Sequence, residues 1–229
     1  MISLENFYDV VKNSSIVPEK NKEWKDEVYN SSYDPTDDYG SEVKIFREEF
    51  PLHKNISWDW IIPVVDAGID DGSTRILDPR IETSSVYNIE ETLKNIQGLD
   101  SNASGDFLEE FCSEITKNDS WLYTTVSHST VHYSDSLKLR YIEAREKHNL
   151  RQCHIYTSYS KKTSFFGRHK DSMSSIIVAG IGDVEYSFDD GKSYVLHPGD
   201  GIYIPRGTYH KPNIFGPRAT FSYCWSYNR

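Results

Sequence analysis

The last third of the chain consists of short segments that alternate between apolar and polar residues. Cys153–Tyr159 and Val184–Phe188 alternate with a period of two, and Ile176–Ala179 is continuously apolar. Such segments predict β-strands, and Asp189-Asp190-Gly191 predicts a hairpin turn. Many short strands with tight turns between them are typical of a jelly-roll barrel. Further strands are predicted at Tyr194–Leu196, Gly201–Ile204 and Ala219–Trp225, with Pro198-Gly199 as one corner.

The first two thirds of the chain have a more mixed pattern. Residues 12–45 are polar and predict a lid, an arm or a partly disordered segment. Apolar residues at helical spacing predict three amphipathic helices, whereas β-branched and aromatic runs predict strands. The predicted helices are Tyr87–Ile96, Ser104–Lys117 and Leu137–His148, and the predicted strands are Trp58–Val65, ending near Gly68, and Trp121–Val131.

These patterns together predict an α+β fold. Its mainly β core is a jelly-roll in the C-terminal part, to which N-terminal helices and extra strands are added. We expect residues 1–150 to form a helical and extended region that packs on the barrel, and residues 151–229 to form the barrel. A chain of 229 residues is long enough to form one compact domain with a sizeable hydrophobic core.

The charge and the termini narrow the possible partners. The formal net charge of −10 argues against nucleic acid, since a nucleic-acid surface normally needs a basic stripe. The N-terminus lacks a basic region followed by an apolar run, and no apolar run is long enough to span a membrane. Cys112, Cys153 and Cys224 are scattered, which suits buried thiols in a reducing cytosol. We therefore expect a cytoplasmic protein that binds neither nucleic acid nor membrane.

Two histidines and an aspartate form a candidate metal site. In a strand, residues i and i+2 point the same way, so His169 and Asp171 converge while Lys170 faces outward. His210 supplies a second imidazole. Two imidazoles and one carboxylate can occupy one face of an octahedral metal and leave the opposite positions open, as in non-haem Fe(II) oxygenases.

The residues around this set resemble the cupin motifs. Gly199–His210 fits G-x5-P-x-G-x2-H, with the trailing asparagine one residue early at Asn213. In the first motif, His169-Lys170-Asp171 is followed by Ser175 where a glutamate normally stands, and by Gly182 at the expected glycine. Residues 152–225 therefore resemble 2-oxoglutarate-dependent oxygenases built on the double-stranded β-helix, including the JmjC-type hydroxylases.

This resemblance implies roles for particular residues. His169, Asp171 and His210 would hold Fe(II) and be the catalytic centre. Arg218 and Thr220 match an R-x-S/T arrangement that binds the distal carboxylate of 2-oxoglutarate. Tyr159 would hydrogen-bond the cosubstrate, and Tyr156 could serve instead. JmjC-type enzymes have a lysine at the positions that residues 184–187 occupy in this chain. These residues read Val-Glu-Tyr-Ser, so the chain departs from the JmjC pattern here.

The predicted function is that of an Fe(II)- and 2-oxoglutarate-dependent dioxygenase that uses O₂ to hydroxylate a small-molecule or protein substrate. Two alternatives remain open at this point. One is a cupin metalloenzyme without 2-oxoglutarate, such as an isomerase or a cofactor-free dioxygenase; the other is a non-catalytic cupin-like binding module.

A second metal site at His128 and His132 would need a helix, and the surrounding β-branched residues favour a strand.

Overall fold

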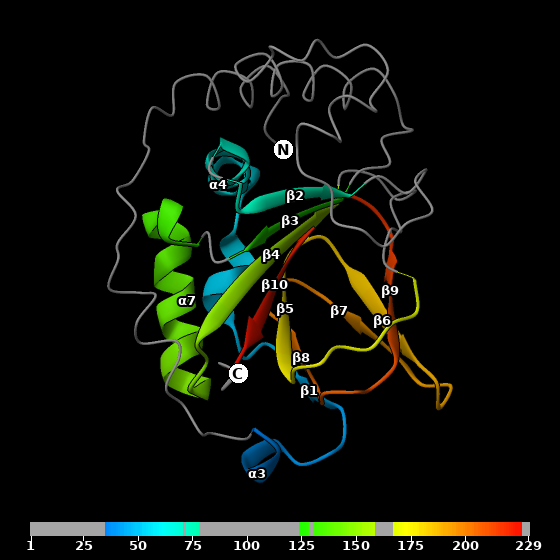
Figure 1. The fold of residues 1–229 in the computed structure, drawn as a ribbon. Helices are drawn as coiled ribbons and strands as arrows, with labels where there is room; N and C mark the ends of the chain where they lie inside the picture. The colour runs from blue at the N-terminus through cyan, green and yellow to red at the C-terminus, as the bar shows by residue number, and fades with distance from the viewer. Residues whose placement is uncertain (1–34, 71, 78–123, 129–130, 159–166, 226–229) are drawn as a thin grey trace.

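The computed structural model describes residues 35–70, 72–77, 124–128, 131–158 and 167–225. Within these residues the strands form two antiparallel sheets (Figure 1). The larger sheet has the order β1-β8-β5-β10-β4-β3-β2, and the smaller has the order β7-β6-β9. The strands are β1 (Lys44–Phe46), β2 (Thr74–Leu77), β3 (Thr124–His128), β4 (Gln152–Ser158), β5 (Ser175–Ile181), β6 (Val184–Phe188), β7 (Ser193–Leu196), β8 (Gly201–Ile204), β9 (His210–Ile214) and β10 (Arg218–Cys224).

Helices cover one face of the larger sheet, and the smaller sheet lies against the other face (Figure 1). The apolar core on the helical side includes Leu137, Ile155 and Phe221, whereas a second core that includes Ile177 and Leu196 lies between the sheets. The helices are α3 (Thr36–Tyr39), η2 (Pro51–Asn55), α4 (Trp58–Asp70), η3 (Val131–Tyr133) and α7 (Asp135–His148).

Most sequence-based predictions for the second half of the chain are confirmed. The jelly-roll strands lie at β4 to β8 and β10, and Trp121–Val131 contains β3. The predicted helix Leu137–His148 is α7, whose first turn is capped by the Ser134 side chain, which accepts from the Leu137 N–H. Asn149 ends the helix in the left-handed conformation. Cys153 and Cys224 are buried thiols, as predicted.

The prediction of a strand at Trp58–Val65 is wrong, because this segment belongs to helix α4. The buried residues Ile61, Val64, Val65 and Gly68 follow the i, i+3, i+4, i+7 spacing of a helix. The prediction relied on the eight residues up to Val65, and a short apolar run does not distinguish a strand from a buried helix. The helical period becomes clear only when Asp66 to Gly68 are included.

Two strands of the larger sheet were not predicted. Lys44–Phe46 falls at the end of the polar segment 12–45, yet it forms β1 and pairs with β8 at the sheet edge. Strand β2 pairs with β3 at the opposite edge. Strands from before residue 150 thus extend the sheet of the barrel, and the division at residue 150 stays a prediction. The predicted helices at 87–96 and 104–117 lie outside the described residues. Among the residues that are described, no helix is both long and apolar enough to cross a membrane.

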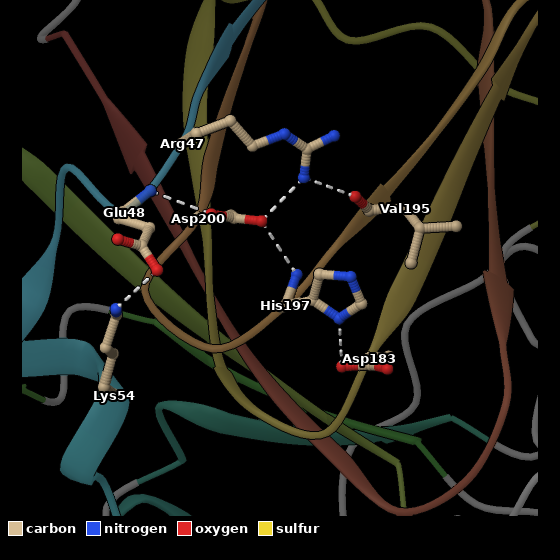
Figure 2. Close-up of polar contacts among 7 residues, drawn as sticks. All are labelled: Arg47, Glu48, Lys54, Asp183, Val195, His197 and Asp200. Carbon is tan, nitrogen blue, oxygen red and sulfur yellow. Dashed lines mark hydrogen bonds and ion pairs between the residues drawn. The ribbon is translucent and has the colours of Figure 1, made fainter.

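A buried aspartate connects the N-terminal strand β1 to the barrel (Figure 2). Asp200 lies in the turn between β7 and β8, and its carboxylate accepts hydrogen bonds from the backbone N–H groups of Glu48 and His197. It also accepts one from Arg47 at 2.6 Å, and the same guanidinium donates to the Val195 carbonyl. Burial alone would raise the pKa of Asp200, but these donors outweigh it and hold the pKa below its ordinary value.

We predict that Asp200→Asn lowers the free energy of unfolding by about 2 kcal/mol, because it weakens several hydrogen bonds to a charged acceptor. A carboxylate with a depressed pKa stabilises the protein above its unfolded pKa of about 3.9, and this contribution is lost as the pH falls through the folded value. Urea titrations should therefore show a difference between wild type and variant at pH 7 that shrinks below about pH 4.

The control for this prediction is Asp183→Asn. Asp183 is a half-exposed aspartate that pairs with His197 in the same region, and exposed ion pairs contribute little. An equal loss of stability in both variants would contradict the role of Asp200.

Candidate metal centre

The structure brings His169, Asp171 and His210 together at one end of the barrel. The candidate ligand atoms of the three residues all lie within 4.8 Å of one another. One carboxylate oxygen of Asp171 lies 3.9 Å from Nε2 of His169, and the other lies 3.8 Å from Nε2 of His210. The three side chains therefore point at one common position.

Backbone pairing explains why the two histidines meet. His169 and His210 form an isolated antiparallel bridge, in which each N–H donates to the other's carbonyl at 2.9 and 2.8 Å. The Gly207 N–H donates to the Asp171 carbonyl at 2.8 Å. The segment before β5 is thus held against the segment that enters β9, with the three candidate ligands on the same side.

The hydrogen bonds of the histidines leave one nitrogen of each ring for a metal. Nδ1 of His169 lies 2.8 Å from the Gly167 carbonyl, and Nδ1 of His210 lies 3.0 Å from the Thr208 carbonyl. A carbonyl only accepts, so each Nδ1 carries the proton and each Nε2 presents a lone pair. Burial lowers the pKa of His210, which favours the neutral imidazole that metal binding requires. The donor set fits a divalent transition metal such as Fe(II).

A cavity extends from these ligands into the barrel and reaches a buried arginine. The space between its atoms is about 360 Å³, part of which is open solvent at its mouth. Its lining residues are Tyr156, His169, Asp171, Ile177, Tyr186, His210, Pro212, Arg218 and Ser222.

Arg218 has an unusual environment for a cation. Its side chain is 1% exposed, and among the described residues no carboxylate pairs with it. One guanidinium nitrogen contacts the Thr220 hydroxyl at 2.5 Å, whereas Nε is buried and no described residue forms a hydrogen bond with it. Burial lowers the pKa of Arg218, yet a guanidinium remains charged at any physiological pH. Such a buried charge calls for an anion in the cavity.

Two tyrosines line the same cavity beside Arg218. Burial raises the pKa of Tyr156 and of Tyr186, so both hydroxyls keep their protons and can donate. Tyr186 lies within residues 184–187, which occupy the positions of the JmjC lysine. The sequence pattern did not identify Tyr186, Ser222, Ile177 or Pro212 as site residues. Strand alternation could have found Ser222, which shares a face of β10 with Arg218 and Thr220.

The remaining candidates are placed as follows. Tyr159 lies outside the described residues, and Tyr156, the alternative, is in the cavity. Ser175, which stands where the first cupin motif has a glutamate, is buried in β5. His128 lies in strand β3, where its Nδ1 is 3.1 Å from Nδ1 of His154 on β4, so it does not share a helix face with His132.

Comparisons of the sequence with known proteins found no relative. No protein-family model matches the chain, and no curated protein matches its sequence. Taken together, the two sheets and the ligand set define a cupin-type double-stranded β-helix with a His-Asp-His set at one end of the barrel.

Solved structures of YcfD, a ribosomal oxygenase from Escherichia coli, share this fold. One matches with a TM-score of 0.55 at 14% identity, over 82% of this chain and 48% of YcfD. YcfD in complex with cobalt and 2-oxoglutarate matches at 14% identity, and YcfD with cobalt and succinic acid at 15%, each with a TM-score of 0.55 over 82% of this chain and 49% of YcfD. The chain thus spans about half the length of these neighbours. At this identity the likeness shows the fold.

We predict that Asp171→Ala weakens binding of Fe(II) or Co(II) by more than about 100-fold, since the loss of a direct anionic ligand should exceed the 10- to 100-fold cost of losing an outer-shell partner. The Asp171 side chain is 46% exposed, so its removal leaves no buried cavity and the barrel should stay folded. Metal titration followed by absorption, together with circular dichroism, checks both expectations.

Asp190→Ala is the matched control, because Asp190 is an exposed carboxylate that pairs with Lys192 in the β6–β7 turn. Wild-type metal affinity in the Asp171 variant would show that the three residues do not form the metal centre.

Proposed function

We propose that this protein is an Fe(II)- and 2-oxoglutarate-dependent oxygenase that hydroxylates its substrate. The observation that carries the proposal is the buried Arg218, which pairs with no carboxylate among the described residues and lies in the same cavity as the His-Asp-His set. A metalloenzyme without a second anion would have no use for this charge, whose burial costs several kcal/mol when it is unpaired. The YcfD structures with cobalt and 2-oxoglutarate support the proposal through the shared fold.

In this function His169, Asp171 and His210 hold Fe(II), which supplies the redox chemistry for O₂ when bound. The guanidinium of Arg218 binds the far carboxylate of 2-oxoglutarate, and the Thr220 hydroxyl keeps that guanidinium in place. Overall, 2-oxoglutarate, O₂ and a substrate C–H bond become succinate, CO₂ and an alcohol.

The tyrosines and apolar residues of the cavity have supporting roles. Tyr156 and Tyr186 donate hydrogen bonds to the same carboxylate, since both stay protonated. Ile177 and Pro212 exclude water from the cavity walls, which strengthens the electrostatic interactions within it.

The position of the ligands also indicates where the substrate binds. His210 begins β9 of the smaller sheet, and His169 is bridged to it, so the ligands approach from that side. A metal held by these residues would lie between them and the larger sheet, where Ser222 lies beside Ile177 in register. We place the substrate, a small molecule or a protein side chain, along this wall. A cytoplasmic location of the protein and its use of O₂ belong to the same proposal.

We predict that Arg218→Ala raises the dissociation constant for 2-oxoglutarate at least tenfold, about 1.4 kcal/mol, while metal affinity is unchanged. Arg218→Lys should recover only part of the loss, because an ammonium lacks the planar two-point contact. Calorimetric titration of 2-oxoglutarate into Co(II)-loaded protein measures both effects, and succinate formation by Fe(II)-loaded protein tests turnover.

The control is Lys211→Ala, which should leave 2-oxoglutarate binding unchanged. Lys211 is an exposed cation next to His210 on β9. If the metal-loaded wild type binds no 2-oxoglutarate, the oxygenase proposal fails. Metal-dependent turnover without 2-oxoglutarate would then identify a plain cupin enzyme, and no turnover a binding module.

A further inference from the structure

The segment that carries His169 and Asp171 is tied to the barrel by isolated hydrogen bonds rather than by a strand ladder. Residues 167–174 belong to no strand of either sheet, and their backbone pairs with β9 at the bridge between His169 and His210. Within the described residues, the Gly207 N–H also donates to the Asp171 carbonyl, and the Arg206 N–H donates to the Ser174 hydroxyl. A metal site needs its ligands ordered in advance, because any ordering that binding must impose lowers the affinity.

Side chains on the outer side of this segment provide additional connections. Arg168 precedes His169, and its guanidinium donates from Nε to Asp189 at 2.5 Å and from a second nitrogen to the other carboxylate oxygen. Asp189 directly follows Phe188, the last residue of β6, and Phe188 pairs with His210 of β9. The Arg168–Asp189 pair thus ties the first histidine's segment to the strand beside the second histidine.

The same guanidinium also stacks on an aromatic ring. The Arg168 guanidinium carbon lies 3.8 Å from the centre of the Tyr209 ring, and Tyr209 directly precedes His210. Lys170 lies over the same ring at 5.1 Å. Since neighbouring residues of an extended chain point to opposite sides, these side chains face outward where His169, Asp171 and His210 face the cavity.

We propose that Arg168, Asp189 and Tyr209 form an outer clamp that positions His169 and His210 for metal binding. The proposal rests on the metal centre of the proposed function and assigns three positioning residues to it. The clamp joins three separate parts of the chain through one planar group: a bidentate ion pair on its edge and an aromatic ring against its face.

The exposure of the clamp separates this role from a general structural one. The Arg168 and Asp189 side chains are 53% and 50% exposed, and exposed ion pairs contribute little to global stability. Their loss should therefore leave thermal unfolding of the metal-free protein nearly unchanged, while metal affinity falls because the ligand segment is no longer held in order.

The experiment is a Co(II) titration of the full chain, followed by the visible absorption of the bound ion, alongside thermal unfolding without metal. Arg168→Ala and Asp189→Ala should each weaken Co(II) binding about 10- to 100-fold, as outer-shell partners do. The double variant should be no weaker than the worse single one, since both remove the same contact. Arg168→Lys should recover part of the affinity, because it keeps the charge but loses the fork and the stacking.

Tyr209 is tested in the same way. Tyr209→Phe keeps the ring and should bind Co(II) like wild type, whereas Tyr209→Ala should weaken binding. Asp190→Ala is the matched control, because it removes the Lys192 ion pair of the same turn without touching the clamp. Wild-type affinity in the Arg168 and Asp189 variants would overturn the clamp, and so would a fall in unfolding temperature that accounts for the whole loss. Failure of wild type to bind Co(II) would instead overturn the metal centre itself.

Discussion

The alternation of side chains along β10 is the constraint on which both the core and the candidate site depend. This strand pairs with β4 on one side and β5 on the other, and all seven of its residues are buried. Ala219, Phe221 and Tyr223 face the helix-covered core. Arg218 and Ser222 line the cavity. A shift of one residue in register would put the arginine into the apolar core and a phenylalanine ring into the cavity, so the pairing that builds the sheet also orients the site.

The candidate metal ligands are held by fewer backbone hydrogen bonds than the residues of the cavity wall. The wall belongs to a continuous ladder of strands, whereas His169 and Asp171 lie on a segment outside any strand. Only His210 begins a regular strand, β9. The barrel therefore supplies the cavity and holds His210 in a strand, whereas His169 and Asp171 depend on local contacts for their positions. The proposed clamp would act on this segment from the outside of the barrel.

The sequence predicted the barrel and the clustering of His169, Asp171 and His210 better than it predicted the surroundings. Alternation and turn residues are local signals, so β4 to β8 and the Asp189 to Gly191 turn were found. The cluster was found because its residue types and motif spacing are specific, and its role as a metal centre stays a prediction. Helix α4 was missed because its apolar run is short, and β1 because a three-residue edge strand owes its existence to the β8 backbone that it pairs with. Tyr186 was missed because its role comes from tertiary neighbours rather than from its own sequence context.

The position of the buried cation distinguishes this site from the JmjC pattern that the sequence partly resembles. In that pattern a lysine would lie among residues 184–187, on β6, but here Tyr186 lines the cavity at that position. Arg218 lines the same cavity from β10, in the opposite sheet. One cavity has room for one such charge, because two buried cations would repel each other and each would pay for desolvation. The neutral tyrosine on β6 and the arginine on β10 are therefore complementary choices, and Tyr186 leaves Arg218 as the charge available to an anion. The missing lysine is therefore compatible with a carboxylate site that is built on Arg218.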